Sequence, residues 1–247
     1  ESLVIALPSG VLIDGVSFGP QVTDVSQGRW PDGSVKITAF PKSPTPGAAN
    51  FLPLENVVIN EMLTHSDPPL EDAVELHNPS GSAVDISGWF LSDSATNLRK
   101  FQIPPNTIIP AGGYLVLYEY QFNRAGDPTN EPFSFSSASG DEVYLSQAIN
   151  GLLTGYRAFA AVGPAENGVS FGRIQTSQGF HFVPTSRRTF GNDAPATTNE
   201  FRLGTGLANS SPKIGPVIIS EIMYQPGVPN DALEFVELRN VSGATVP

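Results

Sequence analysis

The sequence contains no cysteine. A disulfide framework, a thiolate metal site and a cysteine nucleophile are therefore excluded, and the redox compartment is left open. Basic residues are also scarce, because 13 Lys and Arg stand against 24 Asp and Glu and give a net charge of −11. A chain of this sign repels a phosphate backbone, so nucleic acid is not an expected partner.

Long apolar runs are missing as well. Runs such as YLVLY at 114–118 are far too short to cross a bilayer, and the first residues show no signal-peptide pattern. We therefore expect no membrane insertion. The chain opens on Glu1 rather than methionine, which we interpret as a fragment or a processed product of a longer protein.

Glycine and proline, in contrast, are abundant, and the 24 Gly and 23 Pro make up nearly a fifth of the 247 residues. Both residues interrupt helices and favour turns. Short apolar runs bounded by turn clusters follow one another through the middle of the chain, and no amphipathic helix stands out. This pattern predicts an all-β sandwich or barrel, with a long surface loop over residues 122–139.

The chain repeats itself internally. VVINEML at 57–63 returns as VIISEIM at 217–223, and VELHNPSGSAV at 74–84 returns as VELRNVSGATV at 236–246. VSFG at 16–19 returns at 169–172, and TPG at 45–47 has a looser echo in TFG at 189–191. These offsets indicate a repeat unit of about 150 to 160 residues.

We predict one complete unit with parts of two flanking copies. Residues 1–50 would be the C-terminal part of a preceding repeat, 51–200 the complete unit, 201–212 a linker, and 213–247 the N-terminal part of a following repeat. Neither end carries counterparts of the strands between Trp89 and Leu145, so the two ends cannot complete one sandwich together. We expect them to lean on the central unit or to leave strand edges open to partners, including self-association.

Five short motifs of the central unit occur in order between residues 59 and 116. This series resembles the lamin tail domain family, and three segments near the N-terminus resemble the closing strand and tail of its bacterial members. The central unit departs from that ending, because VSFGR at 169–173 is followed by GFHFV at 179–183 instead of a GRWPDG turn. The central motifs are INE (59–61), VELHN (74–78), SGWFLSD (87–93), FQIPP (101–105) and IPAGGYLV (109–116), and the N-terminal segments are VSFGPQ (16–21), SQGRWPDGS (26–34) and TPGAAN (45–50).

The resemblance implies an immunoglobulin-like β-sandwich used for interactions rather than for a known reaction. Bacterial relatives of this kind occur in large secreted or cell-surface proteins, often in several copies. We therefore expect a non-catalytic interaction or structural module of such a protein, with neighbouring repeats and a surface protein or polysaccharide as partners. A nuclear scaffold role like that of animal lamins is a further alternative, although this sequence contains neither a coiled-coil rod nor a basic localisation run, features that could lie outside a fragment.

Glu61 and Glu75, repeated as Glu221 and Glu237, are the best candidates for chemistry. Paired carboxylates can act as general acid and base or bind a hard cation. They can equally accept hydrogen bonds within a sheet or block pairing with other chains, and we favour this structural role. A glycan hydrolase that uses Glu61 and Glu75 is an alternative, which requires carboxylates roughly 5 to 9.5 Å apart across an open cleft.

No other pattern carries a cofactor or a reaction. The acidic loop residues Asp127, Asp141 and Glu142 could hold calcium if the fold brings them together, but no D-x-D-x-D-G spacing appears. The three histidines lack the short spacings of transition-metal sites. No G-x-S-x-G elbow and no phosphate-binding glycine loop is present, so we expect no cofactor and no enzyme activity.

Aromatic residues form a second candidate surface. We predict that Trp89 fills the core, whereas Trp30, in a turn, and the loop residues Tyr120 and Phe122 are available for contacts. With Glu61 and Glu75 they make up the predicted binding surface. A carbohydrate-binding module is accordingly the main alternative function.

Overall fold

The computed structural model describes residues 1–41, 43–177, 179–227, 233–240 and 245–246. Strands make up most of its regular structure, and the two helices of this described part, α1 (Glu119–Phe122) and α2 (Thr198–Phe201), are four residues long. Residues 241–244, which belong to the second repeated stretch, lie outside the described residues. The all-β prediction is confirmed.

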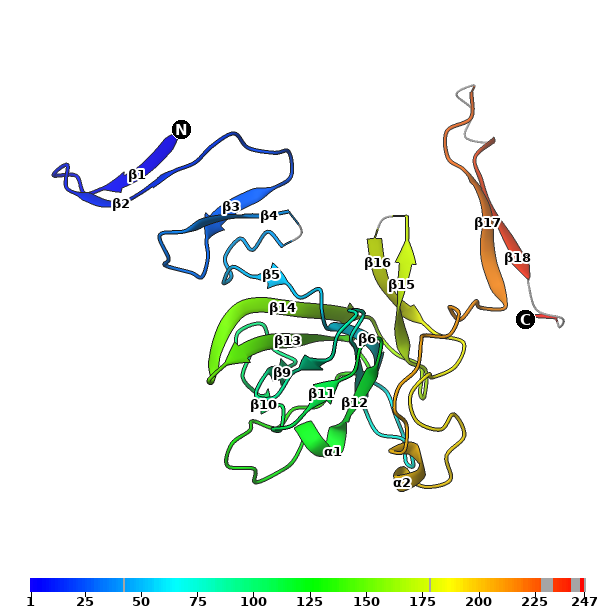
Figure 1. Ribbon diagram of the computed structural model, residues 1–247. Helices are drawn as coiled ribbons and strands as arrows, with labels where there is room; N and C mark the ends of the chain where they lie inside the picture. The colour runs from blue at the N-terminus through cyan, green and yellow to red at the C-terminus, as the bar shows by residue number, and fades with distance from the viewer. Residues whose placement is uncertain (42, 178, 228–232, 241–244, 247) are drawn as a thin grey trace.

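Two five-stranded sheets form the central sandwich (Figure 1). Neighbouring strands within them are antiparallel, except that β5 and β14 run parallel. A short pair, β8 (Val84–Asp85) and β11 (Ile108–Ile109), lies beside them. The first sheet has the order β10 (Phe101–Gln102), β9 (Phe90–Ser92), β13 (Asp141–Ile149), β14 (Leu152–Val162) and β5 (Leu52–Pro53), and the second has the order β12 (Tyr114–Tyr118), β7 (Ala73–His77), β6 (Val58–Leu63), β15 (Phe171–Thr176) and β16 (Gly179–Pro184).

The hydrophobic core lies between these two sheets. Alternate residues point inward, so that Val74 and Leu76 of β7 meet Val143 and Leu145 of β13 in one buried cluster. Trp89 is buried in the same cluster, which confirms its predicted position. This arrangement is the immunoglobulin-like sandwich that the sequence predicted.

A β-bulge interrupts the pairing of β6 with β7. Ile59 pairs with Leu76, but the next pair is Glu61 with Glu75, so Asn60 is an extra residue on β6. Residues before and after the bulge can therefore both face the core. Glu61 and Glu75 face the opposite, outer side of the sheet.

Residues 185–212, here called the covering segment, lie over that outer side. Phe190 and Phe201 pack with Leu63 and Tyr118 in a second apolar cluster, and α2 belongs to this part of the chain (Figure 1). The prediction of a linker over residues 201–212 is therefore wrong. Small residues there permit close approach to the strands, as at Gly206, where a Cβ atom would overlap the Glu75 carboxyl group.

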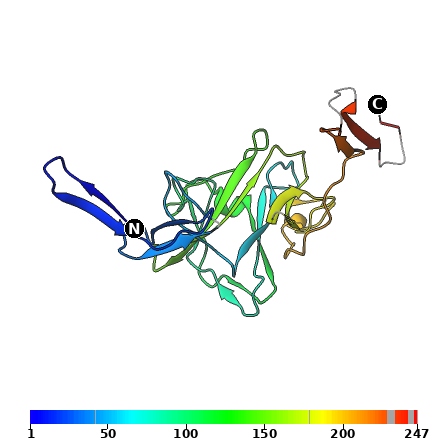
Figure 2. The ribbon, with the colours of Figure 1, turned by 90° about the horizontal axis from the view of Figure 1, so that it is seen from above.

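The two ends form separate two-stranded sheets. Residues around β3–β4 lean on the sandwich, since Phe40 is buried and the rings of Trp30 and Tyr156 lie 5.1 Å apart. The other two hairpins project away from the sandwich in both views (Figure 1, Figure 2). The pairs are β1 (Ser2–Ala6) with β2 (Leu12–Ser17), β3 (Ser26–Arg29) with β4 (Ile37–Phe40), and β17 (Val217–Met223) with β18 (Phe235–Asn240).

Candidate functional site

Glu61 of β6 and Glu75 of β7 lie opposite each other beneath the covering segment. Both side chains are fully buried. Like charges directly opposite each other in adjacent strands destabilise a sheet, and a buried carboxylate without donors is unfavourable. The two carboxyl groups therefore depend on the hydrogen-bond donors that surround them.

The donors to Glu61 come from two distant parts of the chain. The Ser170 hydroxyl donates to its Oε1 at 2.5 Å, and the backbone N–H of Thr189 donates to the same oxygen at 3.0 Å. The Thr189 hydroxyl donates to Oε2. Ser170 directly precedes β15 and Thr189 belongs to the covering segment, so Glu61 holds both against β6.

Glu75 is bound in a similar way by neighbouring amides. The Asn60 side chain donates to Oε1 at 2.5 Å, and the backbone N–H of Leu207 donates to Oε2 at 3.0 Å. Asn209 extends the network, because its Nδ2 donates to the Asn60 carbonyl at 2.8 Å and to the Arg173 carbonyl at 3.2 Å. Asn60, the bulge residue, thus links the Glu75 carboxyl group to Asn209 near the end of the covering segment.

Burial dominates the acid–base behaviour of this pair. It raises the pKa of Glu61 above its ordinary value, although the hydrogen bonds from Ser170 and Thr189 oppose the shift. It also raises the pKa of Glu75 to about 8, against the hydrogen bond from Asn60 and with the help of the nearby Glu61 charge. Glu61 receives more donors, so we assign the negative charge to Glu61 and a proton to Glu75 at neutral pH.

The glutamate pair does not form an open active site. A glycosidase pair works across a cleft that admits substrate and water, whereas these carboxyl groups lie under the covering segment and bind its backbone. The structure therefore contradicts the hydrolase alternative built on Glu61 and Glu75. It also removes both residues from the predicted binding surface and makes them anchors of the covering segment.

The aromatic residues predicted to form a binding surface differ in their exposure and do not share one surface. Phe122 is buried in the main core, where its ring stacks on Phe133 at 4.8 Å, so its predicted place on a surface is wrong. The loop after it is anchored by Phe133 and Phe135, both buried. Tyr120 is exposed, with the Arg202 guanidinium 3.7 Å from its ring centroid. Trp30 is half-buried at the joint with the sandwich.

The carboxyl groups of the three calcium candidates each accept hydrogen bonds from nearby protein groups, and they do not come together around one point. Asp127 accepts from the Thr129 N–H at 2.8 Å, Asp141 from the Ser136 N–H at 2.7 Å, and Glu142 from the Tyr144 hydroxyl at 2.5 Å. In the described part of the chain, no group of three histidine or acidic residues could hold a metal ion. The predicted calcium site therefore gains no support from these residues.

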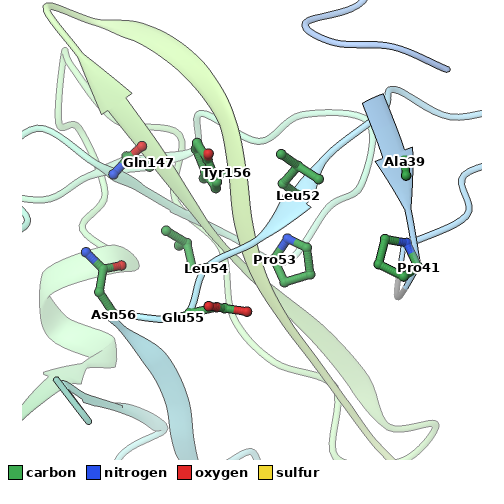
Figure 3. Close-up of a pocket in the computed structure, with 9 residues that line it drawn as sticks. All are labelled: Ala39, Pro41, Leu52, Pro53, Leu54, Glu55, Asn56, Gln147 and Tyr156. Carbon is green, nitrogen blue, oxygen red and sulfur yellow. The ribbon is translucent and has the colours of Figure 1, made fainter. Parts of the chain in front are cut away.

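A groove of about 570 Å³ lies where the N-terminal region meets the sandwich (Figure 3). Tyr156 of β14 and Leu52 of β5 provide apolar surface, and the side chains of Glu55, Asn56 and Gln147 provide polar groups along one side. Tyr156 is partly exposed and also contacts Trp30. An apolar wall with a few polar groups is a common arrangement for a small ligand.

The sequence interpretation missed the donors that complete the glutamate site. Ser170, Thr189 and Asn209 carry no catalytic or metal-binding pattern. Each lies far along the chain from its partner, which is Glu61 for Ser170 and Thr189 and Asn60 for Asn209. One signal was available, because Ser170 lies in the VSFG stretch that also occurs around Ser17. A repeated serine beside a repeated glutamate could have suggested their contact.

Comparison with known proteins gives one family match. The model of the Lamin Tail Domain family matches residues 53–158, from the end of β5 into β14. This stretch includes both buried glutamates but neither β15 nor the covering segment. The comparisons with curated proteins and with solved structures found no match.

Among the described residues, no helix is both long and apolar enough to span a membrane.

Proposed function

Because residues 53–158 form a lamin tail domain, we propose that this chain is an interaction and structural module of a larger secreted or cell-surface protein with several such domains in tandem. Lamin tail domains are immunoglobulin-like modules, and such folds present surfaces for binding on a rigid core. The central glutamates fit this role, since they hold the covering segment in place instead of facing a substrate.

The β17–β18 hairpin is the observation that carries the proposal. Its pairing passes from Ile219–Leu238 to Glu221–Glu237, which makes Ser220 a bulge residue in the position that Asn60 has on β6. The Ser220 hydroxyl donates to Glu237 Oε1 at 2.6 Å, as the Asn60 amide donates to Glu75 Oε1 at 2.5 Å. The hairpin thus repeats the opening of the central domain in register and in hydrogen bonding, which supports a tandem arrangement.

Detection of the natural protein in its source cells tests this proposal. An antibody raised against residues 51–212 should recognise a protein well above 26.2 kDa, the mass of this chain. That protein should lie in the medium or be cleaved when intact cells are treated with protease. A protein of about this chain's own mass, protected from protease inside the cells, would contradict the proposal.

Carbohydrate binding is the second candidate, and the groove around Tyr156 favours it. A partly exposed aromatic ring beside an amide and a carboxylate offers stacking and hydrogen bonding to a sugar. The acidic charge of the chain suggests a neutral or amino-sugar polymer rather than an acidic one.

A glycan array with the whole chain tests this second candidate. Binding should be lost in Tyr156→Ala and retained in Phe159→Ala, which removes another exposed aromatic ring of the same strand outside the groove. Absence of binding to any glycan, or equal loss in both variants, would exclude the groove as a carbohydrate site.

A further inference from the structure

The second sheet of the sandwich ends at β16, and the outer edge of this strand is open. In the described chain β16 pairs with β15 alone. The Thr185 N–H donates to the Ser170 carbonyl at 2.9 Å just outside this ladder, so every second residue from there bonds to β15. Phe180 and Phe182 therefore direct their N–H and C=O groups outward, where no described backbone group bonds to them.

This edge belongs to the central sandwich, and the segments around it along the chain are in place. The covering segment follows β16 and returns beside its end. There Thr185 forms a bridge with Pro212, and the Lys213 N–H donates to the Pro184 carbonyl at 2.6 Å. The returning chain thus occupies only the last residue of the strand and leaves the edge at Phe180 and Phe182 free.

The other edges of the sandwich are short or covered, as is usual for strands that must not pair with another chain. β10 and β5, at the two ends of the first sheet, are two residues long, and β5 includes Pro53. β12, at the opposite end of the second sheet, is buried at Val116 and Tyr118. β16, in contrast, has six residues and contains no Lys, Arg, Asp or Glu.

The sequence of β16 is also a place where the repeated copies differ. Both copies share the stretch SQG, at 26–28 and at 177–179. The N-terminal copy continues with Arg29, Pro31 and Asp32, residue types that oppose the addition of a further strand. The central copy continues instead with FHFV at 180–183. The central unit therefore has an apolar strand edge that its neighbour lacks.

We propose that the β16 edges of two copies of this chain pair antiparallel around a two-fold axis at His181. Phe180 of one copy then exchanges both backbone hydrogen bonds with Phe182 of the other, and the reverse pair is equivalent. His181 lies opposite its own copy, in the non-hydrogen-bonded position between these pairs. Such an interface is isologous and closed, so association stops at a dimer. It goes beyond the proposed tandem function and uses only the central sandwich.

The side chains of β16 suit this pairing. Directly opposite residues of an antiparallel pair lie on the same side of the sheet, so the 52% exposed ring of Phe180 meets Phe182 of the second copy. The Arg173 guanidinium of β15 lies 3.3 Å from the Phe180 ring centroid and supports this ring. The turn end of the β15–β16 hairpin extends beyond β13 and β14, which keeps the axis away from the bulk of the sandwich (Figure 1).

Cysteine substitution tests the contact and its register, because the chain has no cysteine of its own. His181→Cys should give a disulfide-linked dimer on mild oxidation, since its two copies lie within the Cα separation of about 4.4–6.8 Å that a disulfide requires. Val183→Cys, on the same side of the same strand, should not, because its two copies lie about 13 Å apart along the pair. Gln175→Cys, exposed on the same hairpin, measures linkage by random collision. Non-reducing electrophoresis of the whole chain reads all three.

Paired charge variants give a second readout by sedimentation equilibrium. The average mass of the unchanged chain should rise with concentration from 26.2 kDa towards twice that value. His181→Glu and His181→Lys should each stay monomeric alone, because like charges would lie opposite each other, and an equal mixture should form the dimer again. Gln102→Glu, on the edge strand β10 of the other sheet, should associate like the unchanged chain.

Three outcomes would overturn this pairing. They are a chain that stays monomeric at all concentrations, association of His181→Glu alone, and linkage of Val183→Cys or Gln175→Cys as fast as that of His181→Cys. Circular dichroism melting should be the same in all variants, which separates a lost contact from a lost fold. The tandem proposal is unaffected by any of these results, because it is decided by the size and location of the natural protein.

Discussion

Glu61 and Glu75 are the same residue type in the same sheet, yet their surroundings assign them different charges. Glu61 faces a fixed backbone N–H and two hydroxyl groups, and Glu75 faces one backbone N–H and a side-chain amide. Hydrogen bonds to a charged group contribute about 1.5–3 kcal/mol each. The charge is therefore stabilised better on Glu61.

Substitution by glutamine should affect the stability of the protein differently at the two positions. We expect Glu61→Gln to lower the free energy of unfolding by about 2 kcal/mol or more at neutral pH, because an amide nitrogen would then face a donor. Glu75→Gln should lower it by less than Glu61→Gln, since that carboxyl group is already neutral and only one of its two donors, the Asn60 amide or the Leu207 N–H, would face the new amide nitrogen. Urea denaturation measures both values, and a larger loss in Glu75→Gln would contradict the assignment.

The raised pKa of Glu75 predicts a pH dependence of stability. The folded protein keeps a proton between the ordinary value of 4.5 and about 8 that the unfolded chain releases. The stabilisation is therefore complete below pH 4.5 and is lost as the pH rises through about 8, by at most about 1.4 kcal/mol per pH unit. Urea midpoints between about pH 5 and pH 9 should fall in the unchanged protein and fall less in Glu75→Gln.

Gly206 tests the close contact between the covering segment and β7. A Cβ atom there would overlap the Glu75 carboxyl group, and the residue also has φ +81°. Gly126 has a similar φ of +77° with open space around it. Gly206→Ala should therefore destabilise the protein by about 1–3 kcal/mol more than Gly126→Ala, because only the first adds a clash to the backbone strain. Equal melting temperatures of the two variants would disprove the contact.

At the scale of elements, the covering segment behaves as part of the domain. Phe201 of α2 is fully buried, contacts the Tyr118 ring at 5.4 Å and accepts the Tyr118 hydroxyl at its carbonyl. This segment gives the β12–β7–β6 part of the second sheet apolar packing on both of its faces. Removal of the segment would expose two buried carboxyl groups as well as an apolar surface.

The variant Phe201→Ala measures how much the packing of the covering segment stabilises the domain. We expect a loss of about 3–5 kcal/mol in the free energy of unfolding, the usual range for a buried phenylalanine. Leu203→Ala is the control, because this neighbouring side chain is 78% exposed and should change stability by less than about 0.5 kcal/mol. If residues 201–212 were a linker, both variants would unfold like the unchanged protein.

At the scale of the whole molecule, stability is unevenly distributed. The β6–β7 hairpin is covered on both faces, whereas β17–β18 is a two-stranded sheet of mostly exposed residues. An isolated two-stranded hairpin is at most marginally stable in water. Amide hydrogen exchange should therefore be slow in β6–β7 and fast in β17–β18. Equal slow exchange in both hairpins would contradict this distribution.

The sequence by itself determined the strands, the turns between them and the repeated hairpin. These features depend on neighbours along the chain, such as the alternation of Val74 and Leu76 or the recurrence of a glutamate after the same apolar residues. The burial of Trp89 was predictable from the same local pattern, and this residue lies directly before β9 with its side chain in the core. The fold class followed from these local patterns.

Only the tertiary structure decided which segments cover each face of the sheets. Thr189 lies 128 positions after Glu61, so no local pattern connects this donor to its carboxyl group. Phe122 has the composition of a surface loop around it and still enters the core, because Phe133 and Phe135 fold back on it. A side chain's environment depends on the elements that pack against it, and that packing is settled by burial and hydrogen bonding over the whole domain.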